Sequence, residues 1–323
     1  MAVIVAIVVI ALIGMGAMAV DIGRVAAEKA QLQNGADASA LAIANYCVKN
    51  AASCQSTGPS LATQYTPANS NDSTAVVQSV TFPTASTVTV GTSTPASGLS
   101  LGFAHALGFS SEQVQAGATA TWGPPGKGSG FPFAFSSACY DISPTTSAGQ
   151  PQQFSYKPGM YCTGPSGLQI PGGWGWLDNT NCQTSTVAGQ TSIGSDPGNN
   201  LPSGCLAILQ TWVDTINAGG EADVVFPIFD TVTGTGTNAS YHITGYATFK
   251  MIGWKLVANN SAPGSFRNTA AALTSLGISS SLACSGGTDR CVIAQFIRFD
   301  LSDPSFVIGN GQNYGSEIVS LIN

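Results

Sequence analysis

The chain has 323 residues, of which 44% are hydrophobic and only 8% are charged, and its net charge is −6. Ten basic residues give no electrostatic footprint for nucleic acid, and the hydrophobic content excludes a disordered chain. So few charged residues are not typical of the surface of an ordinary cytosolic enzyme. The 38 glycines and 17 prolines favour a fold that is rich in turns and β-strands.

The first twenty residues contain no charged side chain. A helix of that length is about 30 Å long, the thickness of a bilayer core, so residues 1–20 predict a transmembrane helix. A cleaved signal peptide is the alternative; Ala17-Met18-Ala19 would suit the peptidase, but a charged leading region is missing. Residues 21–50 keep helical spacing and predict a helical stalk that continues the span.

Eight cysteines lie outside the apolar segment: Cys47, Cys54, Cys139, Cys162, Cys182, Cys205, Cys284 and Cys291. Their spacing does not match a zinc site, and an even number in a tethered, Ser/Thr-rich chain predicts disulfides. We expect the two local pairs, Cys47–Cys54 and Cys284–Cys291, with the other four pairing among themselves. Disulfides place the body outside the cytoplasm and the N-terminus inside it.

The remaining chain predicts an α+β fold. It comprises a small αβ module at 51–122, a Gly- and Pro-rich linker at 123–130, and a larger β-rich, disulfide-braced extracytoplasmic domain at 131–323. Strands are expected at 76–82, 86–90, 114–122, 131–135, 224–229, 241–256 and 291–299. Short helices are expected at 98–107, 206–216 and 267–276, and a turn-like segment at 164–177.

The segment after the apolar run resembles the TadE/TadG-like pilus-assembly family. The shared pattern falls on Val20, Asp21, Gly23, Lys29, Leu32, Gln33, Ala36, Asp37, Ala38, Ala40, Leu41 and Ala42. Looser similarity to the larger TadG-type members continues through 88–90, 103–108, 114–121, 132–139, 175–178, 225–230 and 246–249. The resemblance implies a membrane-anchored, non-catalytic component of the machinery that builds Flp-type (Tad) adhesive pili.

Two features depart from that family. Val5 stands where processed pilin-like members carry a glutamate, which argues against a standard cleaved pilin. The basic cytoplasmic tail that members usually carry is also missing. Removal of such a tail by a peptidase would instead favour a minor pilin incorporated in the filament.

Candidate catalytic residues are few. Gly98-Leu-Ser-Leu-Gly102 matches the G-x-S-x-G elbow around Ser100, but no apolar strand runs directly into it. We interpret His105 and His242 as structural. Asp141-Ile-Ser-Pro-Thr145 is the nearest approach to a divalent-ion loop of the von Willebrand A type, and its proline counts against that use.

Further polar and aromatic groups have structural interpretations as well. Asp178, Asn179 and Asn181 could ligate calcium but suit a solvated turn better. Asp214, Glu221 and Asp223 cluster in sequence without a defined geometry. The aromatic residues Phe154, Tyr161, Trp174 and Trp176 could stack on a sugar, although packing in the disulfide-braced region is the simpler interpretation.

These observations predict a non-enzymatic assembly protein without cofactor or metal. Its expected partners are the lipid bilayer and other pilus subunits, the latter bound through small side chains of the N-terminal helix. One alternative is a surface-anchored adhesin or binding module that uses loops in 154–200. An extracytoplasmic hydrolase is the other.

Overall fold

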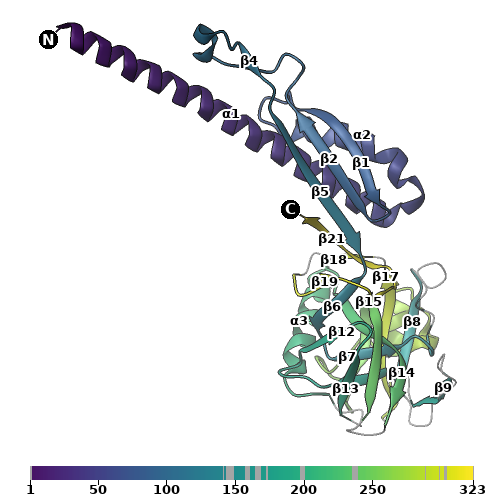
Figure 1. Cartoon of the computed structure of the whole chain (residues 1–323). Helices are drawn as coiled ribbons and strands as arrows, with labels where there is room; N and C mark the ends of the chain where they lie inside the picture. Colours follow the sequence, from purple (N-terminus) through teal and green to yellow (C-terminus); the bar gives the residue numbers. More distant parts are fainter. Residues whose placement is uncertain are drawn as a thin grey trace. The chain divides into compact units, whose positions relative to one another are not determined.

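The computed structural model describes residues 2–140, 142, 149–156, 161–163, 169–171, 174–196, 201–234, 239–287, 289–297, 299–301 and 304–322. The chain forms two compact units (Figure 1). Unit 1 comprises Met1–Trp122 and Val319–Asn323, and unit 2 comprises Gly123–Ile318. Helix and strand are mixed in unit 1, whereas strands dominate unit 2.

Helix α1 (Ala2–Lys49) is continuous, as the sequence predicts. No proline interrupts it, and its 48 residues correspond to a length of about 72 Å. In the part of the chain that the structure describes, no helix is both long and apolar enough to cross a membrane.

The second half of α1 belongs to a folded core. Leu32, Ala36, Ala40 and Ile43 are completely buried. They recur every three or four residues, so they line one face of the helix. This face packs against α2 (Cys54–Ala68) and a sheet, which corrects the expectation of a projecting stalk at 21–50.

The first three strands of the sheet of unit 1 are antiparallel. Strand β1 (Val76–Thr84) pairs with β2 (Thr87–Ser93), and β2 pairs with β5 (Gln115–Gly123). In the sheet order β1-β2-β5-β21-β18, β5 is followed by β21 (Ser316–Ile322). Val319 and Leu321 of that last strand pack on the core of unit 1, so the end of the chain completes the unit.

A small hairpin interrupts unit 1 between β2 and β5. It contains β3 (Leu99–Ser100), the short 3-10 helix η2 (Ala104–Leu107) and β4 (Ser111–Glu112). The helix expected at 98–107 is therefore reduced to η2. The hairpin extends from the same end of unit 1 as the N-terminal half of α1 (Figure 1).

Unit 2 is organised around a mixed sheet of nine described strands. Its main order is β13-β11-β7-β14-β15-β17-β8, with β16 and β20 added beside β15. The members are β7 (Phe133–Ser136), β8 (Pro151–Tyr156), β11 (Trp174–Leu177), β13 (Thr191–Asp196), β14 (Asp223–Thr233), β15 (Ser240–Lys255), β16 (Ser265–Phe266), β17 (Arg290–Ile297) and β20 (Gln312–Asn313). Strands β14, β15 and β17 cover the apolar segments that the sequence assigns to strands.

Smaller elements complete unit 2. Strands β6 (Pro125–Gly130), β12 (Thr184–Val187) and β19 (Val307–Ile308) form a second sheet, and β9 (Tyr161–Thr163) pairs with β10 (Gln169–Pro171). Strand β18 (Phe299–Leu301) runs parallel to β21. The helices are α3 (Cys205–Asn217), α4 (Ala270–Ser275) and η4 (Ser280–Leu282).

Residues 123–130 correct a second expectation. The sequence assigns them to a linker because of their glycines and prolines, yet 125–130 form β6. Small residues are required there because Phe306 lies directly over the strand. A Cβ added to Gly128 would overlap the ring of Phe306, so glycine is the residue that the position accommodates.

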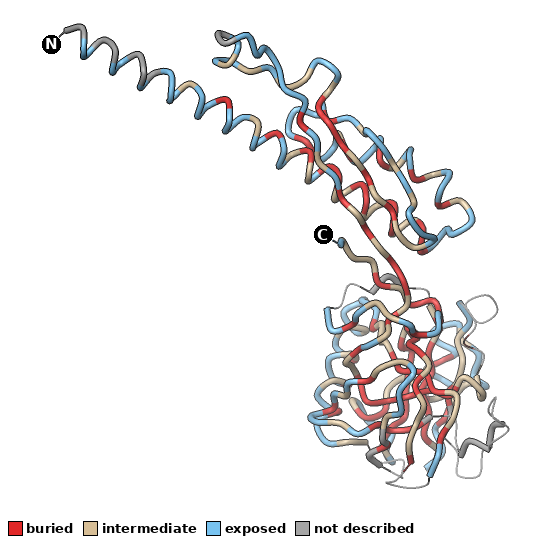
Figure 2. Tube along the Cα trace, in the orientation of Figure 1, coloured by how far each residue is buried: buried red, intermediate tan, exposed pale blue. Residues whose placement is uncertain are grey.

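The core of unit 2 is aromatic. Phe133, Phe135, Phe154, Phe249 and Trp254 are completely buried, and the buried backbone runs through the middle of the sheet (Figure 2). Helix α3 covers this cluster with Leu209 and Val213. Burial of each large ring removes roughly 150–250 Å² of apolar surface from water, so the cluster is the main hydrophobic contribution to this unit.

Candidate functional site

The residues that carry the family pattern lie on α1, and the structure gives several of them a defined contact. Leu32 packs with Ala75 and Val114, and its carbonyl accepts a hydrogen bond of 2.9 Å from the Thr92 hydroxyl. Gln33 Nε2 donates to the Gly117 carbonyl at 3.0 Å and to Asp37 Oδ1 at 2.8 Å. The pattern thus docks the helix on β2 and β5.

Small residues that lie between the pattern residues bring α1 close to α2. A Cβ added to Gly35 would lie 2.8 Å from the Thr66 carbonyl oxygen. The hydroxyls of Ser39 and Thr66 are hydrogen-bonded at 2.8 Å in the buried contact. From α2, Gly58 and Ala62 face this helix, and both are buried. The small side chains expected to receive partner helices are therefore used inside the chain.

Asp21 of α1 accepts several hydrogen bonds at once. Its carboxylate accepts backbone N–H bonds from Gly102 (2.9 Å), Phe103 (2.9 Å) and Ala104 (2.6 Å). The side chain is 5% exposed. The hydrogen bond from Ala104, supported by those from Phe103 and Gly102 and by Arg24, lowers the pKa of Asp21 below its ordinary value. Asp21 thereby caps η2 from a separate element.

Glu28 lies two turns further along α1 in a contrasting environment. Burial raises its pKa above the ordinary value, and the negative charge of Asp72 adds to the effect. Asp21 is thus stabilised as an anion by donors, whereas Glu28 is an acid whose charge the fold disfavours.

Residues 1–45 match the model of the TadE/G-like Flp pilus-assembly family. This segment is similar to the TadE/G-like family. No curated protein and no solved structure matches the chain. The family indicates a pilus-associated role at the cell envelope. The matched segment, which we call the TadE/G-like segment, ends inside α1, four residues before the helix does.

Disulfides brace both units. Cys47–Cys54 joins the end of α1 to the start of α2, and Cys284–Cys291 joins the loop after η4 to β17, so both short-range pairs that the sequence predicts are present. Cys182 is bonded to Cys205, which starts α3, and this pair lies among the four expected to combine. Cys139 is also disulfide-bonded, while the side chain of Cys162 lies outside the described residues.

The candidate nucleophile and histidines fall in separate places. Ser100 lies in the two-residue strand β3 and is exposed, so it does not occupy a strand-to-helix elbow. His105 lies in η2 and is exposed. His242 Nδ1 is 2.8 Å from Asp230 Oδ1, a pair that the sequence analysis missed. The expected strand ended at 229, one residue before Asp230, whereas β14 continues to Thr233 and carries Asp230 opposite β15.

The carboxylates near 214–223 do not converge on one site. Asp214 accepts a 2.7 Å hydrogen bond from Gln210 on the exposed face of α3, and Glu221 pairs with Lys250. Burial raises the pKa of Asp223, and Glu221 adds to the rise. Among the described residues, no cluster of three or more His, Cys, Asp or Glu side chains could hold a metal ion. Asp141 lies outside the described residues.

A shallow groove of about 680 Å³ gathers another set of predicted residues. Asp178, Asn179 and Asn181 line it together with uncharged polar side chains of β6, β12 and β13. The full lining is Ser129, Asp178, Asn179, Thr180, Asn181, Gln183, Thr184, Ser185 and Ser192. Amide and hydroxyl groups of this kind can hydrogen-bond a polar ligand but offer one carboxylate for a cation.

The aromatic residues suggested for sugar stacking divide into two groups. Phe154 and Trp176 are buried in the core of unit 2, at 0% and 1% exposure. A buried ring presents no face to a sugar, so these two are packing residues. The side chains of Tyr161 and Trp174 lie outside the described residues.

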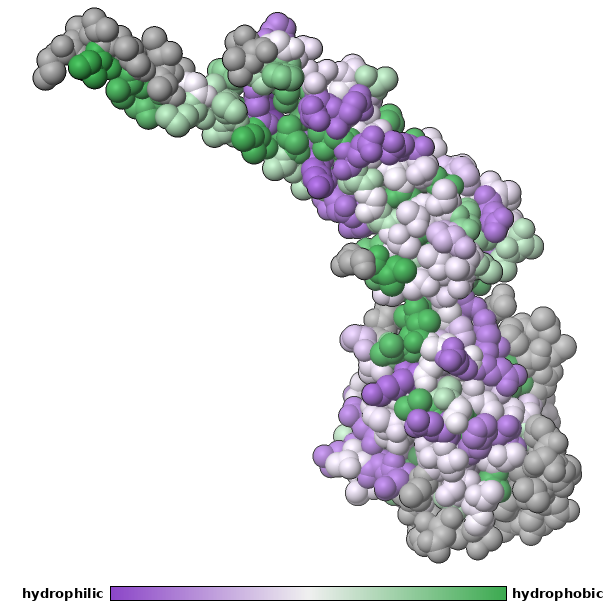
Figure 3. Space-filling model, in the orientation of Figure 1, coloured by the Kyte–Doolittle hydropathy of each residue, from purple (hydrophilic) through white to green (hydrophobic). Residues whose placement is uncertain are grey.

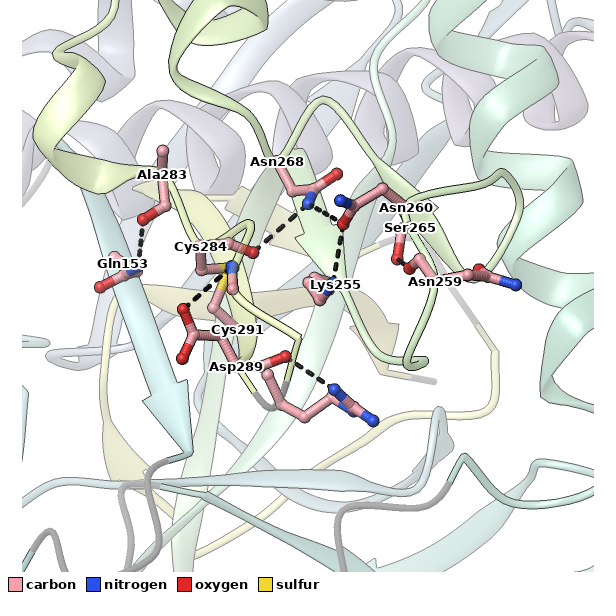
Figure 4. Close-up of a disulfide and its surroundings, with 12 residues drawn as sticks. Gln153, Lys255, Asn259, Asn260, Ser265, Asn268, Ala283, Cys284, Asp289 and Cys291 are labelled. Carbon is pink, nitrogen blue, oxygen red and sulfur yellow. Dashed lines mark hydrogen bonds between the residues drawn. A yellow bond between two sulfur atoms is a disulfide. The ribbon is translucent and has the colours of Figure 1, made fainter.

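Lys255 is 1% exposed, the lowest value among the described basic residues of unit 2, and Figure 4 shows its surroundings. Its Nζ donates to Asn260 Oδ1 at 2.7 Å and to the Ala258 carbonyl at 3.2 Å. Burial lowers the pKa of Lys255, and the charge of Arg290 lowers it further. Asn268 donates to Asn260 and to the Cys284 carbonyl, so this network joins the loop after β15 to the Cys284–Cys291 disulfide.

Proposed function

We propose that the chain is a non-catalytic structural or assembly component of a Flp-type (Tad) pilus system. The observation that carries the proposal is the match of the TadE/G-like segment, combined with the contacts of its residues. Asp21, Leu32, Gln33, Ala36 and Ala40 hold α1 in unit 1, which gives the family pattern a structural use. That use involves packing and hydrogen bonding and no reaction.

Residues 1–20 anchor the protein in the membrane in this proposal. They carry no charge, and the described large apolar side chains of the segment are exposed, including Ile4, Val8, Leu12 and Met15. Figure 3 shows this hydrophobic surface on the part of α1 that leads to the N-terminus. Apolar side chains left without protein neighbours are stable in a lipid environment.

The N-terminus is cytoplasmic and the two units are extracytoplasmic in the same proposal. Disulfides support this orientation because they persist in oxidising compartments. Pilin or another assembly subunit binds the N-terminal half of α1. The second half is excluded as that contact because α2 and the sheet already cover it.

Fractionation of an epitope-tagged chain tests the proposal. Membranes, sheared pili and soluble material are separated and run on reducing and non-reducing gels. We expect the chain in the membrane fraction, with slower migration after reduction. Recovery with sheared fibres would instead identify a minor pilin, and recovery only with soluble material would overturn membrane anchoring.

The polar groove favours a second candidate function, a surface-anchored binding module. Its amides and hydroxyls suit recognition of a carbohydrate by hydrogen bonds rather than by stacking. A glycan array probed with the full chain tests this candidate. Binding that is lost in the Asn179→Ala and Gln183→Ala variants would support it, and an array without signal would reject it.

A further inference from the structure

The loop of residues 101–109, between β3 and β4, is fixed beside the point where the apolar segment of α1 ends. Three of its backbone amides donate to Asp21, the first charged residue of the chain. The loop is also closed on itself, because Leu101 donates to the Ser110 carbonyl at 3.0 Å and Phe109 to the Ala104 carbonyl at 3.1 Å. Its position along α1 is therefore set by hydrogen bonds.

Two large aromatic side chains of this loop are exposed. Phe103 is 51% exposed and Phe109 is 65% exposed. A loop that only capped unit 1 would gain stability by burying these rings, since a buried phenylalanine contributes about 1.5–3 kcal/mol. Gly108, with φ of +92°, turns the backbone at the end of η2, between Phe103 and Phe109.

The large exposed apolar side chains of α1 also end close to Asp21. Large exposed hydrophobic side chains run along the described part of the helix to Val20 and Ile22, next to Asp21. Beyond Ile22, no described residue of α1 is a large exposed hydrophobic. The loop that carries the two exposed rings is therefore bound to α1 at Asp21, between the exposed Val20 and Ile22.

The basic residues that follow Asp21 on α1 suit the lipid headgroup region of a bilayer. Arg24 follows Asp21 by one helical turn, and its guanidinium lies near Gly102 of the loop. Lys29 is exposed about one turn further from the apolar segment. A transition from apolar side chains through aromatic rings to basic residues matches the order of acyl chains, interface and phosphates in a bilayer.

We propose that the 101–109 loop is a membrane foot, in which Phe103 and Phe109 enter the interface of the lipid bilayer that residues 1–20 anchor to. This inference rests on the proposed membrane anchoring of residues 1–20. Asp21 is the positioning residue, because it holds the loop at the depth where the rings meet the acyl chains. The foot gives α1 a second point of contact with the bilayer and fixes the orientation of unit 1 on the membrane surface.

Tryptophan quenching in vesicles tests the foot. The full-length Phe109→Trp variant is reconstituted in vesicles of phosphatidylcholine and phosphatidylglycerol, with or without bromine on the acyl chains. The matched control is Tyr65→Trp, which places the indole on the exposed side of α2. Wild type supplies the background of its five native tryptophans.

We expect brominated lipid to quench most of the emission added by Trp at position 109 and to leave that at position 65 unchanged. Asp21→Asn in the Phe109→Trp background should reduce the quenching while the protein still floats with vesicles. Co-flotation without quenching at position 109 would overturn the foot alone. Failure of the full chain to float would overturn membrane anchoring and the foot together.

Discussion

The two units reach stability in opposite ways. In unit 1, alanine, glycine, serine and threonine let α1 approach α2 so closely that Gly35 faces the Thr66 carbonyl. In unit 2, phenylalanine and tryptophan rings fill the space beside a wide sheet. Unit 1 depends on small side chains that allow two helices to pack closely, and unit 2 depends on large side chains that fill its core. Each unit should therefore be sensitive to the substitution that the other tolerates.

Removal of a central ring should give the largest effect. Phe135 is fully buried and its ring centroid lies 4.5 Å from that of Phe154 and 5.0 Å from that of Phe226. We expect Phe135→Ala to destabilise unit 2 by about 3–5 kcal/mol. Denaturant unfolding of the full chain, with hydrogen exchange in β14 and β15, measures the loss. Phe109→Ala removes an exposed ring and should change the free energy of unfolding little. A loss as large as that of Phe135→Ala would show that burial of the ring is not what stabilises unit 2.

Addition of one methyl group should give the next effect, in unit 1. Gly35→Ala places a Cβ against backbone of α2, and we expect a cost of about 1–3 kcal/mol. Gly23→Ala on the same helix meets no atom within 4 Å, so helix propensity should make it neutral or stabilising by up to about 1 kcal/mol. Hydrogen exchange of α2 amides distinguishes the two. Equal behaviour would show that the helices are not in close contact.

A pH profile should give the smallest effect and concerns unit 1 alone. The raised pKa of Glu28 means that the fold disfavours its charged form. This cost is fully present above the folded pKa and disappears as pH falls toward the ordinary value of 4.5. Glu28→Gln should therefore stabilise unit 1 near neutral pH and flatten this part of the profile. Glu112→Gln, at an exposed position, is the matched control. If Glu28→Gln left the dependence of stability on pH unchanged, the fold would not disfavour the charge of Glu28.

Local patterns in the sequence predicted the longer elements, whereas many shorter strands were missed, among them β8, β11, β12, β13 and β21. Alternating residues located β1, β2 and β5, and the apolar run located β14, because those patterns reflect burial by neighbouring strands. Helix α2 was missed because its Ser, Thr, Gly and two prolines resemble a linker. Its stability comes from contact with α1 and from the Cys47–Cys54 bond, neither of which is visible within the segment.

The candidate site was predictable only in part. The sequence pattern pointed to Asp21 and Leu32 but not to their contacts. Asp21 binds backbone amides that follow it by 81 to 83 residues. Because almost every residue type has a backbone N–H, the residue types at those positions do not reveal the donors. The pairing of Asp230 with His242 depends on the length of β14, which extends past the apolar residues that define it.

The return of β21 to unit 1 has a consequence for biosynthesis. Val319 and Leu321 are the last pieces of a core whose other members precede residue 123. During synthesis, the whole of unit 2 must emerge before that core can close, whereas unit 2 is continuous in sequence and can fold first. Removal of Val319 and Leu321 would leave the small-residue core of unit 1 without its last strand.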